Sequence, residues 1–275
     1  MATPRVLTIA GSDSGGGAGI QADLKAFAAA GAHGMSAIVA LTAQNTVGVS
    51  GVHEVPPAFV TAQLAAVFSD LGVDAAKTGM LFSRGVIEAV ADFLTEHRLA
   101  EHRFAEHRFA EYRLPLVVDP VMVASSGAQL LEDDAVEALV TRLFPLATVV
   151  TPNLAEARAL CVDSTGRSRA ELAEHLVSLG APAAIVTGGH GDPVDHLFDG
   201  RQHIEIAVER LDVAATHGAG CTHSATLAAL LARGLPLEEA ARGAAAAATD
   251  AVRNGLSELG GGDGPVDVLN VKGRA

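Results

Sequence analysis

The sequence of 275 residues has no tryptophan, one tyrosine, two cysteines and three lysines, and its formal net charge is −13. With so few aromatic side chains and no basic block, the chain lacks the surface that nucleic acids bind, so we expect no nucleic-acid partner. Cys161 and Cys221 are too few and too far apart for a disulfide framework, which indicates a cytoplasmic protein. No apolar run reaches the ~20 residues that span a membrane, and the first residues turn acidic too soon for a signal peptide.

The chain does have abundant apolar sequence, 49% of its residues, arranged as β-type runs that alternate with helical patterns. This order predicts a single α/β domain over residues 1–275, with three layers: a mostly parallel central sheet and helices on both of its faces. Asp199-Gly200 between alternating runs predicts a small β-hairpin addition, and Ser168 with Glu171 predicts a capping box. An alanine-rich helix is expected from about Gly220 to Arg253. The predicted strands lie at 5–11, 36–44, 73–80, 114–120, 147–153 and 182–189.

One segment does not follow the alternation. Residues 96–114 read EHRLA-EHRFA-EHRFA-EYRL, a repeat of five residues. Five residues rotate a helix by about 140°, so the repeated side chains do not share one face and the pattern is not a coiled coil. We interpret it as a local duplication that lengthens a surface helix or loop; a partner-binding segment is the alternative.

The stretch GSDSGGGAGIQADLKAF, residues 11–27, concentrates glycine between a predicted strand and a predicted helix. It contains neither the dinucleotide fingerprint nor the P-loop motif. Such a turn fits equally well a ligand that touches bare backbone and a tight turn with no ligand. Asp13 and Asp23 flank the turn, and each is either a partner of the helix dipole or a residue that holds a substrate hydroxyl.

A second glycine turn opens the stretch THGAGCTHSATLAALLARG, residues 216–234. Gly218, Ala219 and Gly220 would leave N–H groups unpaired at a helix start, a geometry suited to an anion. Cys221 lies in the first turn, where we expect the helix dipole to lower the pKa of its thiol. A thiolate there could accept a proton from an alcohol while the N–H groups stabilise a moving phosphoryl group. On local features alone, a small buried cysteine is the simpler interpretation.

Seven motifs in one order change that balance. TIAGSDSGGGAGIQADLK, TAQNT, KTGML, VVDPVM, TPNLAEA, GGH and THGAGCT, with a glycine-rich close GGGDGPVD, resemble the hydroxymethylpyrimidine/phosphomethylpyrimidine kinases of thiamine synthesis. That family belongs to the ribokinase-like superfamily, and the resemblance runs from about Val6 to Asp267. It implies a ribokinase-like fold and Mg²⁺-dependent transfer of a phosphoryl group from ATP to 4-amino-5-hydroxymethyl-2-methylpyrimidine, and then to its monophosphate.

The resemblance also assigns roles to residues on the substrate side. Gly218 to Cys221 match the anion hole and the catalytic residue of the family. Gln44 matches the glutamine that reads the pyrimidine, and an amide is indeed complementary to an aminopyrimidine edge. Gly11, Asp23 and Met80 fall in substrate-side positions. A polar strand end for Gln44 and a core methionine for Met80 are the plainer alternatives. We expect the two glycine turns to form one pocket.

For the metal and the phosphates, the resemblance implies Asp119 and Glu156, with Asn153 in the same turn as Glu156. Both acidic residues follow predicted strands, where α/β sheets bind their ligands, and Mg²⁺ usually takes one or two carboxylates plus phosphate oxygens. Without the resemblance, Asp119 before a proline would be interpreted as a turn former and Glu156 as a charge at a helix start.

Three positions depart from the family. Thr187, before GGH, and Ser125 stand where the family often has lysine, so two candidate phosphate contacts are lost. We keep Thr187 as a residue of the ATP side and expect Lys77 to be the remaining phosphate partner, although a lysine that extends its amine to solvent is the alternative. Ala219 replaces a common threonine, which should spare the backbone anion hole.

Two other functions stay open. A pyridoxal or pyridoxine kinase on the same fold is the first, because both substrates are hydroxymethyl heteroaromatics and a glutamine can also bind a pyridine. A non-catalytic pyrimidine-binding relative is the second, because of the missing lysines. Members of the family are often dimers, which makes a homodimer a further expectation that the residues do not fix.

Overall fold

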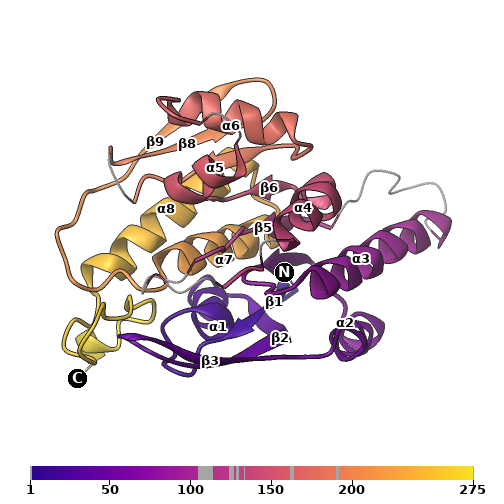
Figure 1. The fold of residues 1–275 in the computed structure, drawn as a ribbon, viewed down its shortest axis with the longest axis horizontal. Helices are drawn as coiled ribbons and strands as arrows, with labels where there is room; N and C mark the ends of the chain where they lie inside the picture. Colours follow the sequence, from indigo (N-terminus) through magenta and orange to yellow (C-terminus); the bar gives the residue numbers. More distant parts are fainter. Residues whose placement is uncertain are drawn as a thin grey trace.

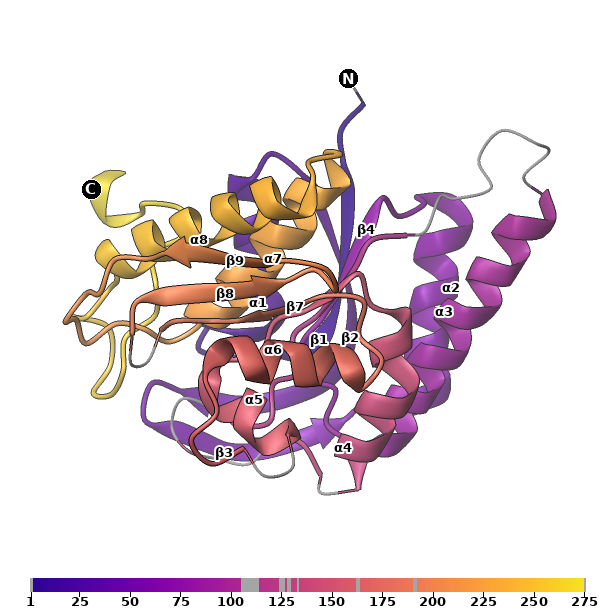
Figure 2. The ribbon, with the colours of Figure 1, turned by 90° about the horizontal axis from the view of Figure 1, so that it is seen from above.

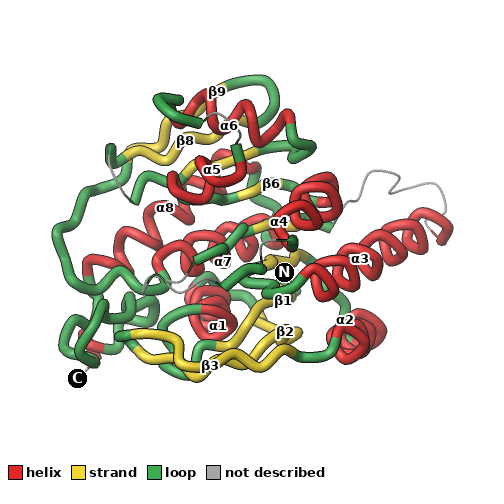
Figure 3. Tube along the Cα trace, in the orientation of Figure 1, coloured by secondary structure: helices red, strands yellow, loops and turns green. Residues whose placement is uncertain are grey.

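A computed structural model describes residues 2–104, 114–123, 127, 130–132, 134–161, 164–189 and 192–274. Its centre is a nine-stranded sheet in the order β3-β2-β1-β4-β5-β6-β7-β8-β9. The six central strands, β2, β1, β4, β5, β6 and β7, are parallel to one another. Strand β3 pairs antiparallel with β2, and β8 and β9 continue the sheet antiparallel beyond β7. Figure 3 shows β3 and the β8–β9 pair at opposite ends of the sheet. The strands are β1 Arg5–Ser12, β2 His33–Asn45, β3 Gly48–Glu54, β4 Ala75–Thr78, β5 Leu116–Val118, β6 Val149–Val150, β7 Ala184–Val186, β8 Val194–Phe198 and β9 His203–Ala207.

Helices cover both faces of this sheet (Figure 1). The α-helices are α1 Gly19–Ala29, α2 Pro57–Asp70, α3 Arg84–Phe104, α4 Ala135–Ala138, α5 Leu154–Leu160, α6 Arg169–Ser178, α7 Ala219–Ala232 and α8 Leu237–Arg253. Shorter turns lie at Leu139–Leu143, Phe144–Leu146 and Lys272–Arg274. None of the described helices is long and apolar enough to cross a membrane.

Two apolar cores explain the layers. Alternate strand residues point to opposite faces: Leu7 and Ile9 of β1 join the core with α2 to α6, whereas Val6 joins the core with α1, α7 and α8. Figure 2, seen from above, shows α1, α7 and α8 on one side of β1, with α2 and α3 on the other. The predicted three-layer, mostly parallel α/β architecture is confirmed.

Most predicted elements are present, with two differences. The hairpin forms around Asp199 and Gly200, and Ser168 with Glu171 forms the capping box. The strand β3 was not expected. The expected helix from 220 to 253 is two helices, because Gly234 adopts φ +82° and Pro236 has no N–H to continue α7.

The pentad repeat is only partly described. Helix α3 continues to Phe104, so the first part of residues 96–114 is helical. Residues 105–113 lie outside the described part of the chain. The expected surface insertion therefore stays a prediction.

Candidate active site

The two glycine turns touch each other through bare backbone. Gly218 begins α7 in the left-handed conformation, with φ +86°, and a Cβ there would overlap the carbonyl oxygen of Gly17. A Cβ on Gly17 would in turn overlap the ring of His217. Only glycine permits this approach. The two turns, about 200 residues apart in sequence, are therefore neighbours in space, as expected.

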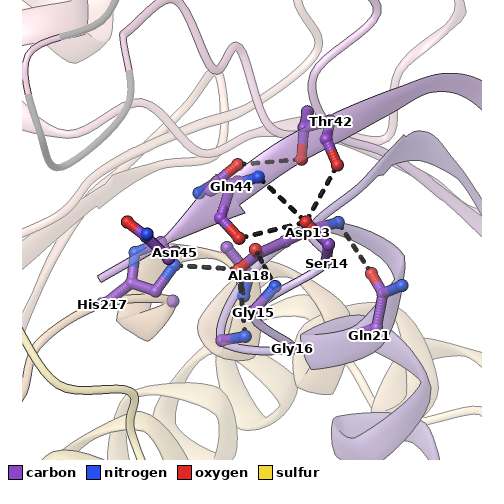
Figure 4. Close-up of polar contacts among 12 residues, drawn as sticks. Asp13, Ser14, Gly15, Gly16, Ala18, Gln21, Thr42, Gln44, Asn45 and His217 are labelled. Atoms are coloured by element: carbon purple, nitrogen blue, oxygen red, sulfur yellow. Dashed lines mark hydrogen bonds and ion pairs between the residues drawn. The ribbon is translucent and has the colours of Figure 1, made fainter. Parts of the chain in front are cut away.

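Asp13 and His217 join the two turns through side chains (Figure 4). The carboxylate of Asp13 accepts the amides of Gly15, Gly17 and Ala18 at 2.8–3.0 Å, and Nε2 of His217 lies 3.0 Å from Oδ2. Burial opposes the charge of Asp13, but these hydrogen bonds, with that of His217 first, hold its pKa below the ordinary value. Sequence reasoning singled out Asp13 but not His217, because nothing local indicates a partner 204 residues away.

The first turn also contacts Gln44 of β2, the residue expected to read the pyrimidine. Ser14 Oγ accepts the backbone N–H of Gln44 at 2.9 Å. The hydroxyl of Thr42 donates to the carbonyl of Ser12 at 2.8 Å and lies 3.2 Å from Oε1 of Gln44. Both contacts of Gln44 are drawn in Figure 4. Gly11 donates its amide to the carbonyl of Met80 at 3.0 Å, and a Cβ on Gly11 would overlap the methyl end of the Met80 side chain. Gln44 thus lies beside the first glycine turn, and Gly11 and Met80 form a close pair.

Asp23 and Lys77 form a buried ion pair. Both side chains are fully buried, and Lys77 Nζ lies 2.9 and 3.0 Å from the two oxygens of Asp23. Thr8 donates its hydroxyl to the same carboxylate at 2.6 Å. Burial opposes the charge of Lys77, but Asp23, Cys221 and Asp119 outweigh it and raise its pKa. In the ligand-free protein, Asp23 and Lys77 therefore pair with each other and are not exposed to a substrate or a phosphate.

Cys221 lies in the first turn of α7, above this buried pair. The amide of Gly19, at the start of α1, acts to lower the pKa of its thiol. The side chain is partly exposed, yet loss of hydration raises the pKa of Cys221 to about 12; Lys77 opposes that rise, and Asp23 and Asp119 add to it. The expectation of a lowered pKa is wrong for the ligand-free protein, because burial and two carboxylates outweigh the helix dipole.

The first turn of α7 also offers an anion fewer backbone N–H groups than expected. Ala219 donates its amide to the carbonyl of Thr216 at 3.0 Å, so this donor is already used. Gly220 and Cys221 are the next amides of the first turn, and a helix offers such amides no acceptor within itself. The amides suited to a phosphate therefore lie at Gly220 and Cys221.

The two acidic residues assigned to the metal lie in each other's electrostatic field. Asp119 follows β5, is 4% exposed, and accepts the hydroxyl of Ser224 at 2.8 Å. Lys77 Nζ is 3.7 Å from the same oxygen. Burial, and then the charge of Asp119, raise the pKa of Glu156 to about 8. Among the described residues, no group of three or more metal-ligating side chains occurs, so this site offers two carboxylates.

The ends of the next two strands carry the residues expected on the ATP side. Asn153 and Glu156 follow β6, and Thr187 follows β7. Asn153 caps α5, and the Glu156 carboxylate accepts the Asn153 amide at 2.9 Å in a reciprocal capping box. Thr187 pairs with Asn153 in an isolated parallel bridge. The sequence placed both residues on the ATP side, and the structure brings them together. Ser125 lies outside the described residues.

Comparisons with known proteins identify the family of this chain. The sequence profile of the family described as phosphomethylpyrimidine kinase matches residues 13–267. The hydroxymethylpyrimidine/phosphomethylpyrimidine kinase of Rhizobium meliloti is 47% identical over 271 residues, covering 96% of each chain. The thiamine biosynthesis bifunctional protein ThiED of Geobacter sulfurreducens is 51% identical over 95% of this chain, which spans only 51% of that longer protein.

A solved structure extends the likeness to three dimensions. The pyridoxal kinase of Staphylococcus aureus in complex with AMP-PCP and pyridoxal superposes with a TM-score of 0.81 at 34% identity, covering 99% of this chain and 96% of that one. The ATP analogue AMP-PCP in that structure agrees with the expectation that this kinase family uses ATP. The ordered motifs, the ribokinase-like layers and the profile match over most of the sequence together place this chain in the phosphomethylpyrimidine kinase family.

Proposed function

We propose that this protein transfers the γ-phosphoryl group of ATP to 4-amino-5-hydroxymethyl-2-methylpyrimidine and then to the resulting monophosphate. One observation carries the proposal: the first glycine turn, which contacts the backbone of Gln44 through Ser14, also touches the start of α7 through Gly17 and Gly218. A phosphoryl acceptor and a phosphoryl group need such adjacent sites, because oriented reactants supply much of the rate enhancement.

On the acceptor side, Gln44 offers both a carbonyl oxygen and an amide N–H₂ to the aminopyrimidine edge. We propose that Gly11 and Met80, which are in contact with each other, form an apolar wall for the ring. This set supports a flat heteroaromatic substrate with one polar edge.

Cys221 takes the proton of the acceptor hydroxyl as the new oxygen–phosphorus bond forms and the bond to the leaving ADP breaks. With a pKa of about 12 the thiol is protonated before substrates bind, and only its thiolate form accepts this proton. Charge builds on the phosphoryl oxygens, and the amides of Gly220 and Cys221 stabilise it there. The ammonium of Lys77 lowers the pKa of Cys221 and so stabilises the thiolate form.

Asp119 and Glu156 fit a divalent cation. Burial and the charge of Asp119 raise the pKa of Glu156, and a bound cation would favour the ionised carboxylate. When bound, Mg²⁺ neutralises charge on the phosphates. Asn153 and Thr187 lie at the same edge and are our proposed nucleotide contacts.

A coupled assay of ADP release with the hydroxymethylpyrimidine as acceptor tests the activity. We expect turnover that needs both the pyrimidine and Mg²⁺, and a second equivalent of ADP as the monophosphate is consumed. Well-folded protein that releases no ADP above the rate without acceptor would overturn the proposal.

Pyridoxal kinase activity is the second candidate, because the S. aureus enzyme shares the fold and was solved with pyridoxal. The comparison is kcat/KM for pyridoxal against the pyrimidine in the same assay. We expect the pyrimidine to be preferred, and Gln44→Leu to reduce kcat/KM for the pyrimidine more than for pyridoxal. A preference for pyridoxal would reassign the acceptor but leave the catalytic arrangement unchanged.

We also propose that the protein works in the cytoplasm as a homodimer. Its two cysteines are unpaired, as in reducing compartments. Strand β3 lies at the sheet edge, and Leu41 and Val47 near it are 46% and 65% exposed. Light scattering coupled to gel filtration should give a mass of twice 27.9 kDa, and a monomer at micromolar concentration would contradict the dimer.

A further inference from the structure

Asp13 and His217 form a side-chain bridge between the two halves of the proposed site. Both residues are buried, with 3% and 8% of their surfaces exposed. Because a carboxylate only accepts hydrogen bonds, Nε2 of His217 is the donor in the 3.0 Å contact. We call this pair the clasp. The three backbone amides that also donate to Asp13 fix its carboxylate rigidly within the first turn.

The first side of the clasp leads directly to the acceptor site. Ser14 follows Asp13, and its hydroxyl accepts the amide of Gln44 at 2.9 Å and donates to the carbonyl of Thr42 at 2.9 Å. The amide of Asp13 itself donates to the side chain of Gln21 on α1 at 2.9 Å. Any displacement of Asp13 therefore moves the backbone that carries Gln44.

The other side leads to the site of phosphoryl transfer. His217 immediately precedes Gly218, the first residue of the turn that opens α7, and Cys221 follows four residues later. The backbone of His217 is held by the C-terminal glycine-rich segment, through Gly264 and Val266 at 3.2 and 3.1 Å. His217 thus connects the C-terminal segment, with which it pairs, to the start of α7.

We propose that Asp13 and His217 are positioning residues, and that their hydrogen bond sets the distance and orientation between the ring held at Gln44 and the phosphoryl group held at α7. The inference rests on the proposed function, since it concerns the alignment of the two reactants. Neither residue needs to touch a substrate. Each acts through a neighbour: Asp13 through Ser14 and Gln44, and His217 through Gly218 and Cys221.

Misalignment has a distinct kinetic signature. Each reactant still binds to its own side, so KM changes little, whereas the bound reactants no longer meet in the reactive geometry. A displacement of about 1 Å can lower the rate about 100-fold. We expect His217→Ala to lower kcat by 10- to 100-fold and to change KM for ATP and for the pyrimidine by less than about threefold.

Conservative variants separate positioning from general damage. His217→Gln keeps an N–H donor toward Asp13 and should recover most of the lost kcat. Asp13→Asn keeps one acceptor but turns an N–H₂ group toward the amides of Gly17 and Ala18, so it should behave like His217→Ala. The matched control is His203→Ala, which removes another histidine–carboxylate contact, 2.9 Å from Glu174, far along the sheet on β9. Its kcat should equal that of the wild type.

Hydrogen exchange of the ligand-free protein tests the clasp without any chemistry. We expect His217→Ala to raise exchange at residues 14–19 as well as at 217–222, and Asp13→Asn to do the same, whereas His203→Ala leaves both segments unchanged. If the wild type has no kinase activity, the proposed function fails while this exchange result still judges the clasp. Exchange that rises only beside the mutated residue, or a kcat of His217→Ala equal to the wild type, would overturn the inference.

Discussion

At the scale of single residues, the chemistry depends most on Cys221. Removing a general base typically lowers the rate by 10² to 10⁴, so Cys221→Ala should reduce kcat by about that factor while KM for ATP stays nearly constant. Steady-state ADP release at saturating substrates measures it. Cys161→Ala is the matched control, because Cys161 lies in the core with α5, away from the glycine turns. A kcat of Cys221→Ala within twofold of the wild type would remove the thiol from the mechanism.

A second residue, Glu156, should report on metal binding through a proton. Its pKa is about 8 in the metal-free protein, above the ordinary 4.5, because of burial and the charge of Asp119. The folded state therefore holds this proton more tightly than the unfolded state, and the resulting stability is full below pH 4.5 and is lost as the pH rises to about 8. At pH 7 the carboxyl is mostly protonated, and a metal needs it ionised.

Binding of Mg²⁺ with AMP-PCP at pH 7 should thus release about one proton from Glu156. Calorimetric titration in buffers of different ionisation enthalpy measures the number of protons. The same titration of Glu156→Gln supplies the control, since it retains the protons that the nucleotide itself releases. Equal proton release by the two proteins would show that Glu156 stays protonated when the metal binds.

Sequence reasoning found residues whose role depends on a local motif and missed those whose role depends on a distant partner. Gln44, Gly11 and Met80 were identified from motifs, and the structure puts them beside the first glycine turn. Asp23 and Lys77 were also identified, but nothing in the sequence indicates that residues 54 positions apart neutralise each other. His217 was passed over for the same reason.

At the scale of elements, the start of α7 requires a glycine at one position and not at its neighbour. Gly218 has φ +86°, and its hypothetical Cβ would overlap Gly17, whereas Gly220 has no atom within 4 Å of such a Cβ and lies within α7. Gly218→Ala should lower the free energy of unfolding by at least about 1–3 kcal/mol. Gly220→Ala should raise it by up to about 1 kcal/mol.

Urea unfolding followed by circular dichroism measures both free energies. The two variants make the same chemical change two residues apart, so a difference between them reflects backbone conformation and contact alone. Equal stability of Gly218→Ala and Gly220→Ala would mean that the two glycine turns do not touch in solution.

The elements that the sequence predicted are those with a buried, regular pattern. Strands β1, β4 and β5 are buried along their whole length or nearly so, and their apolar runs were clear. The sequence does not predict strand β3, because this strand lies at the sheet edge, carries two glycines, and has no buried residue. Helices α7 and α8 were merged because alanine continues through both; the conformation of Gly234 ends the first.

At the scale of the whole molecule, a buried charged cluster joins elements that are far apart in sequence. Asp23 belongs to α1, Lys77 to β4, Asp119 to the end of β5 and Ser224 to α7. These contacts connect the sheet to the helices of one face beneath Cys221. We propose that residues 1–275 therefore unfold as one cooperative domain. The fluorescence of an attached label and circular dichroism should then record a single transition at the same urea concentration.

Substitution of Lys77 tests whether this buried cluster is charged in the folded protein. The Lys77 ammonium lies 2.9 Å from Asp23 and 3.7 Å from Asp119, so Lys77→Met leaves a buried carboxylate without this counter-charge. Losing one partner of a buried ion pair costs about 3–5 kcal/mol, whereas the double variant Lys77→Met/Asp23→Leu removes both charges and should be more stable than Lys77→Met alone. Urea unfolding at pH 7 measures all three proteins. A loss below about 0.5 kcal/mol in Lys77→Met, a change of the same size as at ordinary surface positions, would mean that the pair is not charged in the folded protein and that the thiol of Cys221 has no cation beneath it.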